Sequence, residues 1–173
     1  DSNKTSFNFM YRNNEMNQIP SYRISTRSPF GEINSNKFKS YVGLVQHKLD
    51  FNFADASIIV GGTIDYSPQD YYAKKIRVTY NEETKKFVDY TETALYNLFY
   101  EADILNYATY AQFEIAPFTN FKLTGALRYD GFSYDYDNKD EGESGVRDQK
   151  VTYNNVSPKI GMNFNINQRS GVY

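Results

Sequence analysis

The feature that most constrains the fold is a strict two-residue alternation of apolar and polar side chains, sustained over segments of about 10 to 13 residues. Between residues 156 and 166 the alternation has no break: Val156, Pro158, Ile160, Met162, Phe164 and Ile166 are separated by Ser157, Lys159, Gly161, Asn163 and Asn165. Successive side chains of a strand point to opposite faces, so this pattern predicts a β-strand with one apolar and one polar face. The same reasoning predicts strands over residues 5–12, 41–51, 56–66, 105–116 and 121–130.

The connections between these segments alternate in length. Long ones cover about 13–38, 67–103 and 131–151, and short ones cover 52–55, 117–119 and 167–170. Long outer loops and short periplasmic turns are typical of outer-membrane β-barrels. Within the longest connection, residues 75–80 and 85–90 predict a small hairpin around 81–84, and Leu95 and Phe99 give residues 91–103 a weak helical spacing.

Composition restricts the function. No run of 18 apolar residues occurs, which excludes a helical membrane span. A mean hydropathy of −0.69 with 17% aromatic residues fits strands that have one apolar face and one face exposed to water. The chain has no cysteine and one histidine, so disulfides, zinc–thiolate sites, hydrolytic triads and histidine metal clusters cannot be assembled from it. We therefore expect no enzyme and no cofactor, and a net charge of −2 argues against nucleic acid as a partner.

Turn lengths predict how the strands pair. A four-residue turn at 52–55 places Tyr41 opposite Tyr66, and a three-residue connection at 117–119 places Tyr107 opposite Tyr129 and Glu114 opposite Lys122. Both tyrosine pairs then lie on the apolar face, nine or ten residues from their turns. The distance between each pair and its turn is about the thickness of the hydrocarbon layer. The pairs therefore lie at the far boundary of that layer, where a belt of aromatic side chains is expected.

Three motifs follow one another at the expected spacing: Tyr110-Ala111-Gln112-Phe113-Glu114, then Gly125-Ala126-Leu127-Arg128-Tyr129-Asp130, then Ser157-Pro158-Lys159-Ile160-Gly161. Together they resemble the barrel of TonB-dependent receptors, most strongly from Leu105 onward. The resemblance implies an all-β fold, with these six or seven antiparallel strands being a fragment of a plugged transmembrane barrel of about 22 strands. We expect residues 1–173 to belong to that one barrel domain, with the plug and the energy-coupling box preceding Asp1.

The resemblance also implies function. Such receptors lie in the outer membrane of Gram-negative bacteria and import scarce nutrients with energy from the TonB–ExbB–ExbD complex. The acidic 131–151 connection and the S-P-K-x-G strand favour the iron-complex branch, with a ferric siderophore or a haem-like complex as ligand. Implied partners are the lipid bilayer, lipopolysaccharide and a surface lipoprotein. A passive porin or structural barrel, and a soluble ligand-binding β-barrel, stay open as alternatives.

Two groups of side chains are candidates for ligand binding. The longest connection carries a tyrosine-rich group that offers large rigid contact areas, or else packs the loop or meets lipopolysaccharide: Tyr71, Tyr72, Tyr80, Tyr90, Tyr96 and Tyr100. Charged residues on the polar face would contact ligand or plug, or else form cross-strand ladders: Lys122, Arg128 and Lys159, with Glu114 and Asp130.

Two further groups are weaker candidates. The acidic segment carries Asp135, Asp137, Asn138, Asp140, Glu141 and Glu143, but its spacing does not fit an EF-hand, since Asp140 stands where glycine is needed. His47 has the parity of the apolar face, which argues against a role as haem or metal ligand. We expect no metal site.

Overall fold

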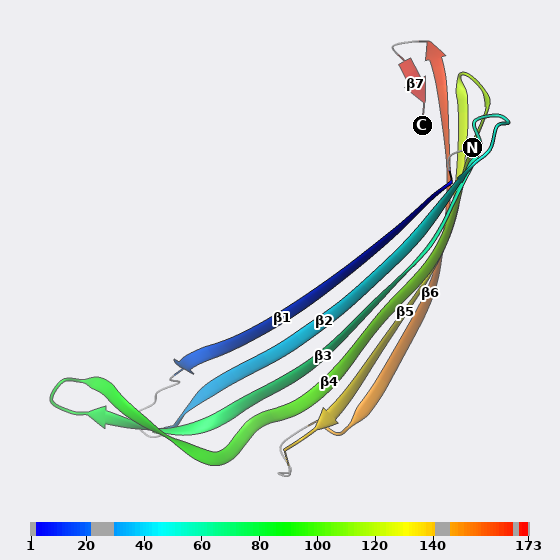
Figure 1. The fold of residues 1–173 in the computed structure, drawn as a ribbon. Helices are drawn as coiled ribbons and strands as arrows, with labels where there is room; N and C mark the ends of the chain where they lie inside the picture. Colours follow the sequence, from blue (N-terminus) through cyan, green and yellow to red (C-terminus); the bar gives the residue numbers. More distant parts are fainter. Residues whose placement is uncertain (1–2, 22–29, 141–145, 168–169, 173) are drawn as a thin grey trace.

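In the computed structural model, which describes residues 3–21, 30–140, 146–167 and 170–172, the chain is one antiparallel sheet with the strands in sequence order. The strands are β1 (Lys4–Ser21), β2 (Phe30–Asp50), β3 (Ser57–Asn81), β4 (Lys86–Phe118), β5 (Phe121–Asn138), β6 (Gln149–Asn167) and β7 (Ser170–Val172). Figure 1 shows that the long strands curve together as one bent sheet. Each of the six predicted alternating segments matches one of these strands, exceeding its bounds by at most one residue, which confirms the all-β antiparallel fold.

The strands are longer than predicted. About ten residues suffice to cross a bilayer, yet β3 has 25 residues and β4 has 33. The excess lies at the end with the long connections, so most of 67–103 is strand. The expected helix over 91–103 is wrong, because this segment pairs with residues 68–77 of β3, with register shifts on either side of Lys74. Among the described residues, no helix is long and apolar enough to cross a membrane.

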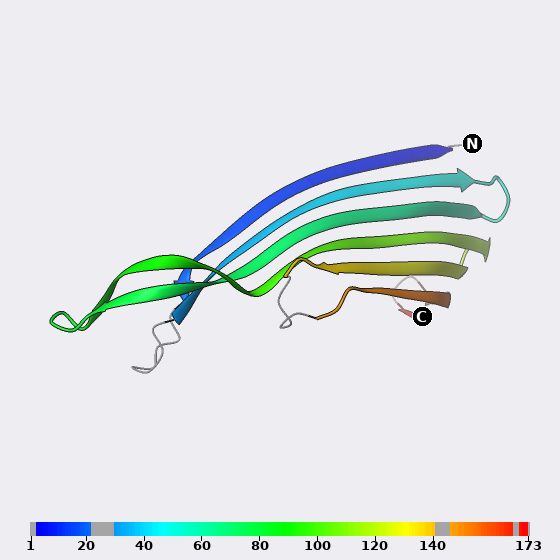
Figure 2. The ribbon, with the colours of Figure 1, turned by 90° about the horizontal axis from the view of Figure 1, so that it is seen from below.

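The β3–β4 hairpin extends beyond the ends of the other strands, as Figure 2 shows. Its tip is a turn over residues 82–85, in which the Asn81 side chain accepts hydrogen bonds from the backbone N–H groups of Glu83 and Thr84, both at 2.9 Å. Tyr80 pairs with Phe87 across the two strands. The predicted hairpin around 81–84 is therefore confirmed.

The sheet has one apolar and one polar face, as the alternation predicts. We call the side with Phe7, Val45, Ile64, Phe113 and Ile160 the apolar face. The register of the strands from β1 to β6 places these side chains on the same side of the sheet. Large apolar side chains there are open to the surroundings: Ile160 is 81% exposed and Phe7 is 76% exposed. The opposite side, the polar face, carries side chains such as Ser40, Asp65 and Arg128.

The turn between β2 and β3 sets their register. Phe51 N–H donates to Ala56 O at 2.8 Å, and Ala56 N–H donates to Phe53 O at 3.0 Å. Ala54 and Asp55 have positive φ angles of 52° and 45°, which close the loop. The strands then pair as predicted, with Tyr41 opposite Tyr66 and their ring centroids 6.4 Å apart.

The predicted β4–β5 register is wrong by two residues. Thr119 and Asn120 form the turn, Phe118 pairs with Phe121, and Tyr107 lies opposite Gly131 rather than Tyr129. Glu114 likewise lies opposite Thr124, not Lys122. The observed register places aromatic rings against glycine, because the Phe113 ring covers Gly125 and the Tyr107 ring covers Gly131. A shift of two residues keeps every side chain on its predicted face.

Candidate ligand-binding wall

Hydrogen bonds cross the polar face from strand to strand. Arg12 Nη2 donates to Ser40 Oγ at 3.4 Å, Ser40 Oγ donates to Asp65 Oδ1 at 3.0 Å, and Ser67 Oγ donates to the same oxygen at 2.7 Å. These contacts link β1, β2 and β3. Asp65 is thus held as an acceptor, with its charge partly compensated by the donors around it.

Tyr110 fixes the middle of this face. Its ring lies over Gly61 of β3, where an added Cβ atom would be 2.5 Å from the phenol oxygen, and its hydroxyl donates to Gln46 Oε1 of β2 at 2.9 Å. One side chain of β4 therefore spans β3 and reaches β2. Only glycine leaves room for that ring.

The cations predicted for this face are largely neutralised. Lys122 Nζ lies 2.6 Å from Glu114 Oε2, and Arg128 Nη2 lies 2.8 Å from Asp130 Oδ1. The Glu114–Lys122 contact is diagonal, since the two residues are not direct partners in the register. Lys159 is exposed and has no hydrogen-bond or ion-pair partner within the part of the chain that the structure describes. The cross-strand ladder interpretation therefore fits Lys122, whereas Arg128 pairs along its own strand.

A hollow of about 500 Å³ lies between the strands at Arg128. Asp65, Asn106, Arg128 and Asp130 supply polar groups to its wall, and Phe132 borders it. Phe132 stacks on Tyr153 of β6 with ring centroids 6.2 Å apart. The hollow therefore combines a paired guanidinium, carboxylates and an aromatic border.

Beyond the hollow, four tyrosines of the polar face form a row across β3, β4 and β5. The ring centroids are 5.3 Å apart for Tyr71–Tyr100, 4.9 Å for Tyr100–Tyr136 and 6.4 Å for Tyr136–Tyr134. We call Tyr71, Tyr100, Tyr136 and Tyr134 the aromatic row. Contacts at these distances stabilise the arrangement and present a continuous surface of rings.

Three hydroxyls of this row, those of Tyr71, Tyr100 and Tyr136, stay protonated to higher pH than usual. Burial raises the pKa of Tyr71, with Glu32 adding to the effect. Burial is also the main cause of the raised pKa of Tyr100 and of Tyr136, and Asp148 contributes at Tyr136. These three hydroxyls are thus neutral at physiological pH and can donate hydrogen bonds.

The structure does not bring the six candidate tyrosines to one surface. Tyr71 and Tyr100 lie in the aromatic row, whereas Tyr72 is on the opposite face, in edge contact with Tyr96 at 6.2 Å. Lys74 Nζ lies 5.7 Å above the Tyr96 ring on that side. Tyr80 and Tyr90 belong to the projecting hairpin. Of the charged candidates, Arg128 and Asp130 border the hollow, and Lys122, Glu114 and Lys159 do not.

Several residues of the wall were not among the sequence candidates, among them Asp65, Phe132, Tyr134 and Tyr136. The last three recur at every second position of β5, so the alternation of residues 121–130, continued past residue 130, would have placed them on the polar face. Because a loop is predicted to begin at residue 131, the alternation is not followed beyond residue 130.

The acidic segment forms ion pairs. Asp135 Oδ2 is 2.9 Å from Lys150 Nζ, and Lys139 Nζ lies 2.5 Å from Asp137 Oδ2 and 3.1 Å from Glu101 Oε2. Asp140 also has an interaction partner, and residues 141 and 143 lie outside the described part of the chain. No group of three or more acidic or histidine residues in the described ranges is arranged to hold a metal ion.

His47 has the predicted parity on the apolar face, opposite Val60 and Thr5. Its Nδ1 lies 2.7 Å from Thr5 Oγ1. This hydrogen bond satisfies one ring nitrogen on a face that offers few polar partners.

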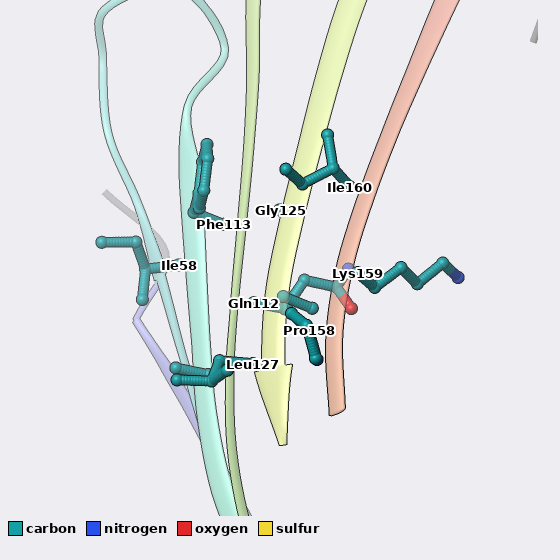
Figure 3. A pocket seen from close by; sticks show the side chains of 10 residues that line it. Ile58, Gln112, Phe113, Gly125, Leu127, Pro158, Lys159 and Ile160 are labelled. Atoms are coloured by element: carbon teal, nitrogen blue, oxygen red, sulfur yellow. The ribbon is translucent and has the colours of Figure 1, made fainter. Parts of the chain in front are cut away.

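The apolar face has a groove of about 450 Å³ where small side chains meet large ones. Figure 3 shows Ile58, Phe113 and Leu127 on one side of the strands and Lys159 extending away from them. The groove is lined by the small residues Ala111 and Gly125 and by the large side chains of Phe113, Leu127 and Ile160. A continuous exposed apolar face of this extent on a sheet suits contact with lipid chains.

Taken together, a curved meander with a lipid-compatible face, a polar face and short turns at one end defines the wall of a transmembrane β-barrel. Comparison with known families agrees: the family model described as "TonB dependent receptor-like, beta-barrel" matches residues 1–173, and the chain belongs to that family. No curated protein and no solved structure gave a significant match. Members of the family are outer-membrane receptors and transporters rather than enzymes. In such a barrel the apolar face meets lipid, and the polar face lines the lumen.

Proposed function

We propose that this chain forms part of the wall of an active-transport receptor in the outer membrane of a Gram-negative bacterium. The receptor binds a scarce nutrient, a ferric siderophore or a haem-like iron complex, and imports it with energy delivered by the TonB–ExbB–ExbD complex through a segment N-terminal to the barrel. The observation that carries the proposal is the aromatic row, which lies on the lumen side of a barrel of this family. Tyrosine rings bind bulky, partly apolar ligands at low entropic cost.

The apolar face supports the membrane part of the proposal. Tyr11, Tyr41 and Tyr66 are in ring contact, and the Tyr66 hydroxyl donates to Asp103 Oδ1 at 2.7 Å. Further along, Tyr129 OH donates to Asn154 Oδ1 at 2.9 Å. Such a band of tyrosines with anchored hydroxyls suits the boundary between the lipid chains and the lipopolysaccharide headgroups. A surface lipoprotein would meet the outer ends of the strands.

The test is uptake of radioactive iron by cells that carry the whole receptor. Supplied as a siderophore complex or as haem, iron should enter receptor-positive cells, and uptake should fall to background when TonB is deleted. Uptake that continues without TonB would instead favour a passive pore.

Two neighbouring tyrosines provide matched variants. Tyr71→Ala removes a ring from the aromatic row and should weaken uptake at low ligand concentration, whereas Tyr72→Ala removes the same ring from the opposite face and should not. Barrel assembly is compared by the gel mobility of unheated samples. Equal loss in both variants would contradict a binding role for the row.

A further inference from the structure

The charges beside the hollow of the lumen-side wall are balanced. Two cations there stand beside two carboxylates, because Arg12 is linked to Asp65 through Ser40 and Arg128 pairs with Asp130. Toward the aromatic row, Lys75 lies opposite Glu32 in the register. Lys159, which has no partner among the described residues, does not border the hollow. An anion bound at the hollow would have to displace a carboxylate from its cation.

The aromatic row itself has acidic neighbours. The negative charge of Glu32 contributes to the raised pKa of Tyr71, and that of Asp148 contributes to the raised pKa of Tyr136. Asp148 Oδ1 also accepts a hydrogen bond from the backbone N–H of Asn138 at 2.8 Å. The contact in which Lys74 lies over Tyr96 is on the opposite face. A negative ligand at the row would thus be repelled rather than held.

The polar groups around the row are uncharged hydrogen-bonding groups. Gln69 Nε2 donates to Asn36 Oδ1 at 3.1 Å, and Asn34 Nδ2 donates to Gln18 Oε1 at 3.0 Å. The Tyr136 hydroxyl and Asn34 Oδ1 are buried and have no partner among the described residues, and Tyr136 is only 6% exposed. A buried polar atom without a partner is costly, so a hydrogen-bonding group from outside the described residues would stabilise both atoms.

We propose that this wall recognises an uncharged ligand, one that places flat or ring-shaped apolar faces on the aromatic row and hydroxyl, amide or carbonyl groups against Tyr136 and the neighbouring amides. The inference rests on the proposed receptor function and narrows its substrate class, because many iron chelates carry a net negative charge and would be disfavoured here.

Two matched pairs of probes test it on the whole receptor in detergent. The first pair is an uncharged iron(III) trihydroxamate complex and a trianionic iron(III) tris-catecholate complex. The second is a neutral maltohexaose and an oligogalacturonate of equal length. We expect the uncharged member to bind at least about tenfold more tightly than its anionic counterpart, with a dissociation constant that changes little between low and high salt.

Tighter binding of an anionic probe, or binding of none of the four, overturns the inference. Preference for the tris-catecholate complex would overturn the inference of an uncharged ligand, while the proposal of iron import would still stand. Preference for neutral maltohexaose with no binding of either iron complex would uphold the charge inference and remove the iron proposal. The two failures are thereby distinguishable.

Variants separate the rings from the charges. The double variant Lys74→Gln with Glu92→Gln removes an ion pair from the opposite face, keeps the net charge of the receptor and should bind the preferred uncharged probe within about twofold of the parent. Tyr100→Ala, which interrupts the aromatic row, should weaken binding about tenfold or more. The opposite ranking, with the charge pair essential and the ring dispensable, would overturn the inference.

Discussion

Three glycines on this sheet are sites where an aromatic ring from β4 occupies the space of a missing side chain. Tyr110 covers Gly61 on the polar face, whereas Phe113 covers Gly125 and Tyr107 covers Gly131 on the apolar face. Gly161 of β6 differs, because an added Cβ atom there would meet nothing within 4 Å. These glycines therefore test whether the ring contacts stabilise the sheet.

We expect Gly61→Ala in the whole receptor to lower the free energy of unfolding by about 1–3 kcal/mol, because the new methyl group overlaps the Tyr110 ring and the backbone oxygen of Val45. Gly161→Ala is the matched control and should change it by less than about 0.5 kcal/mol. Urea titration in detergent, followed by gel mobility of the folded form, measures both. Equal destabilisation would show that the ring over Gly61 contributes nothing specific.

At the residue scale, the sequence predicts the face of a side chain better than its contacts. His47 was assigned correctly to the apolar face because parity alone decides it. The prediction of one tyrosine-rich surface includes both Tyr71 and Tyr72, although their adjacent positions in a strand put them on opposite faces. Residues 67–103 are predicted as a loop, and in a loop the alternation of faces along a strand does not apply.

At the element scale, turn length decides how much of the register is predictable. The β2–β3 register follows from the turn at 52–55 and holds along both strands to Phe30 and Arg77. The β4–β5 register was assigned from a turn at Pro117, but Pro117 lies within β4, and a register irregularity between Ile115 and Phe118 absorbs the difference. Sequence alone does not show which of the two turns is compatible with ring-on-glycine packing.

Neighbouring residues of β6 test the assignment of faces. Ile160 lies on the apolar face opposite Gly125, in the middle of the predicted span 121–130, and Lys159 lies on the polar face. Ile160→Arg should cost about 2–4 kcal/mol because it places a charge in the hydrocarbon layer. Lys159→Gln should leave stability nearly unchanged. Unfolding of the receptor in lipid vesicles measures both, and a larger cost for Lys159→Gln would reverse the assignment.

The ends of the hairpins test the orientation in the membrane. An epitope inserted in the tip of the β3–β4 hairpin, between Glu82 and Glu83, should be labelled by antibody on intact cells, because the hairpin extends beyond the sheet at the end with the long connections. The same epitope between Asn52 and Phe53, in the short turn, should be labelled only after permeabilisation. Labelling of the 52–53 insertion on intact cells would contradict this orientation.

At the scale of the whole molecule, the sheet is open. β1 pairs only with β2 among the described strands, and beyond β6 the described pairing consists of the short β7. An edge strand in the hydrocarbon layer leaves backbone N–H and C=O groups without partners, at a cost of several kcal/mol each. The smallest natural barrels use about eight strands, so this wall needs further strands to close.

We therefore predict that residues 1–173 expressed alone do not form a stable barrel in lipid vesicles. The apolar face favours insertion, but the two open edges oppose it, and the edge cost grows with every residue of β1 and β6 that lies in lipid. Protease digestion of reconstituted samples measures the outcome: the whole receptor should leave a resistant membrane fragment, and the isolated chain should be degraded. A resistant species from the isolated chain would mean that its edges pair with one another or with a second copy. The variants Asn8→Cys and Asn163→Cys, combined in a chain without natural cysteine, would distinguish these two kinds of pairing by cross-linking.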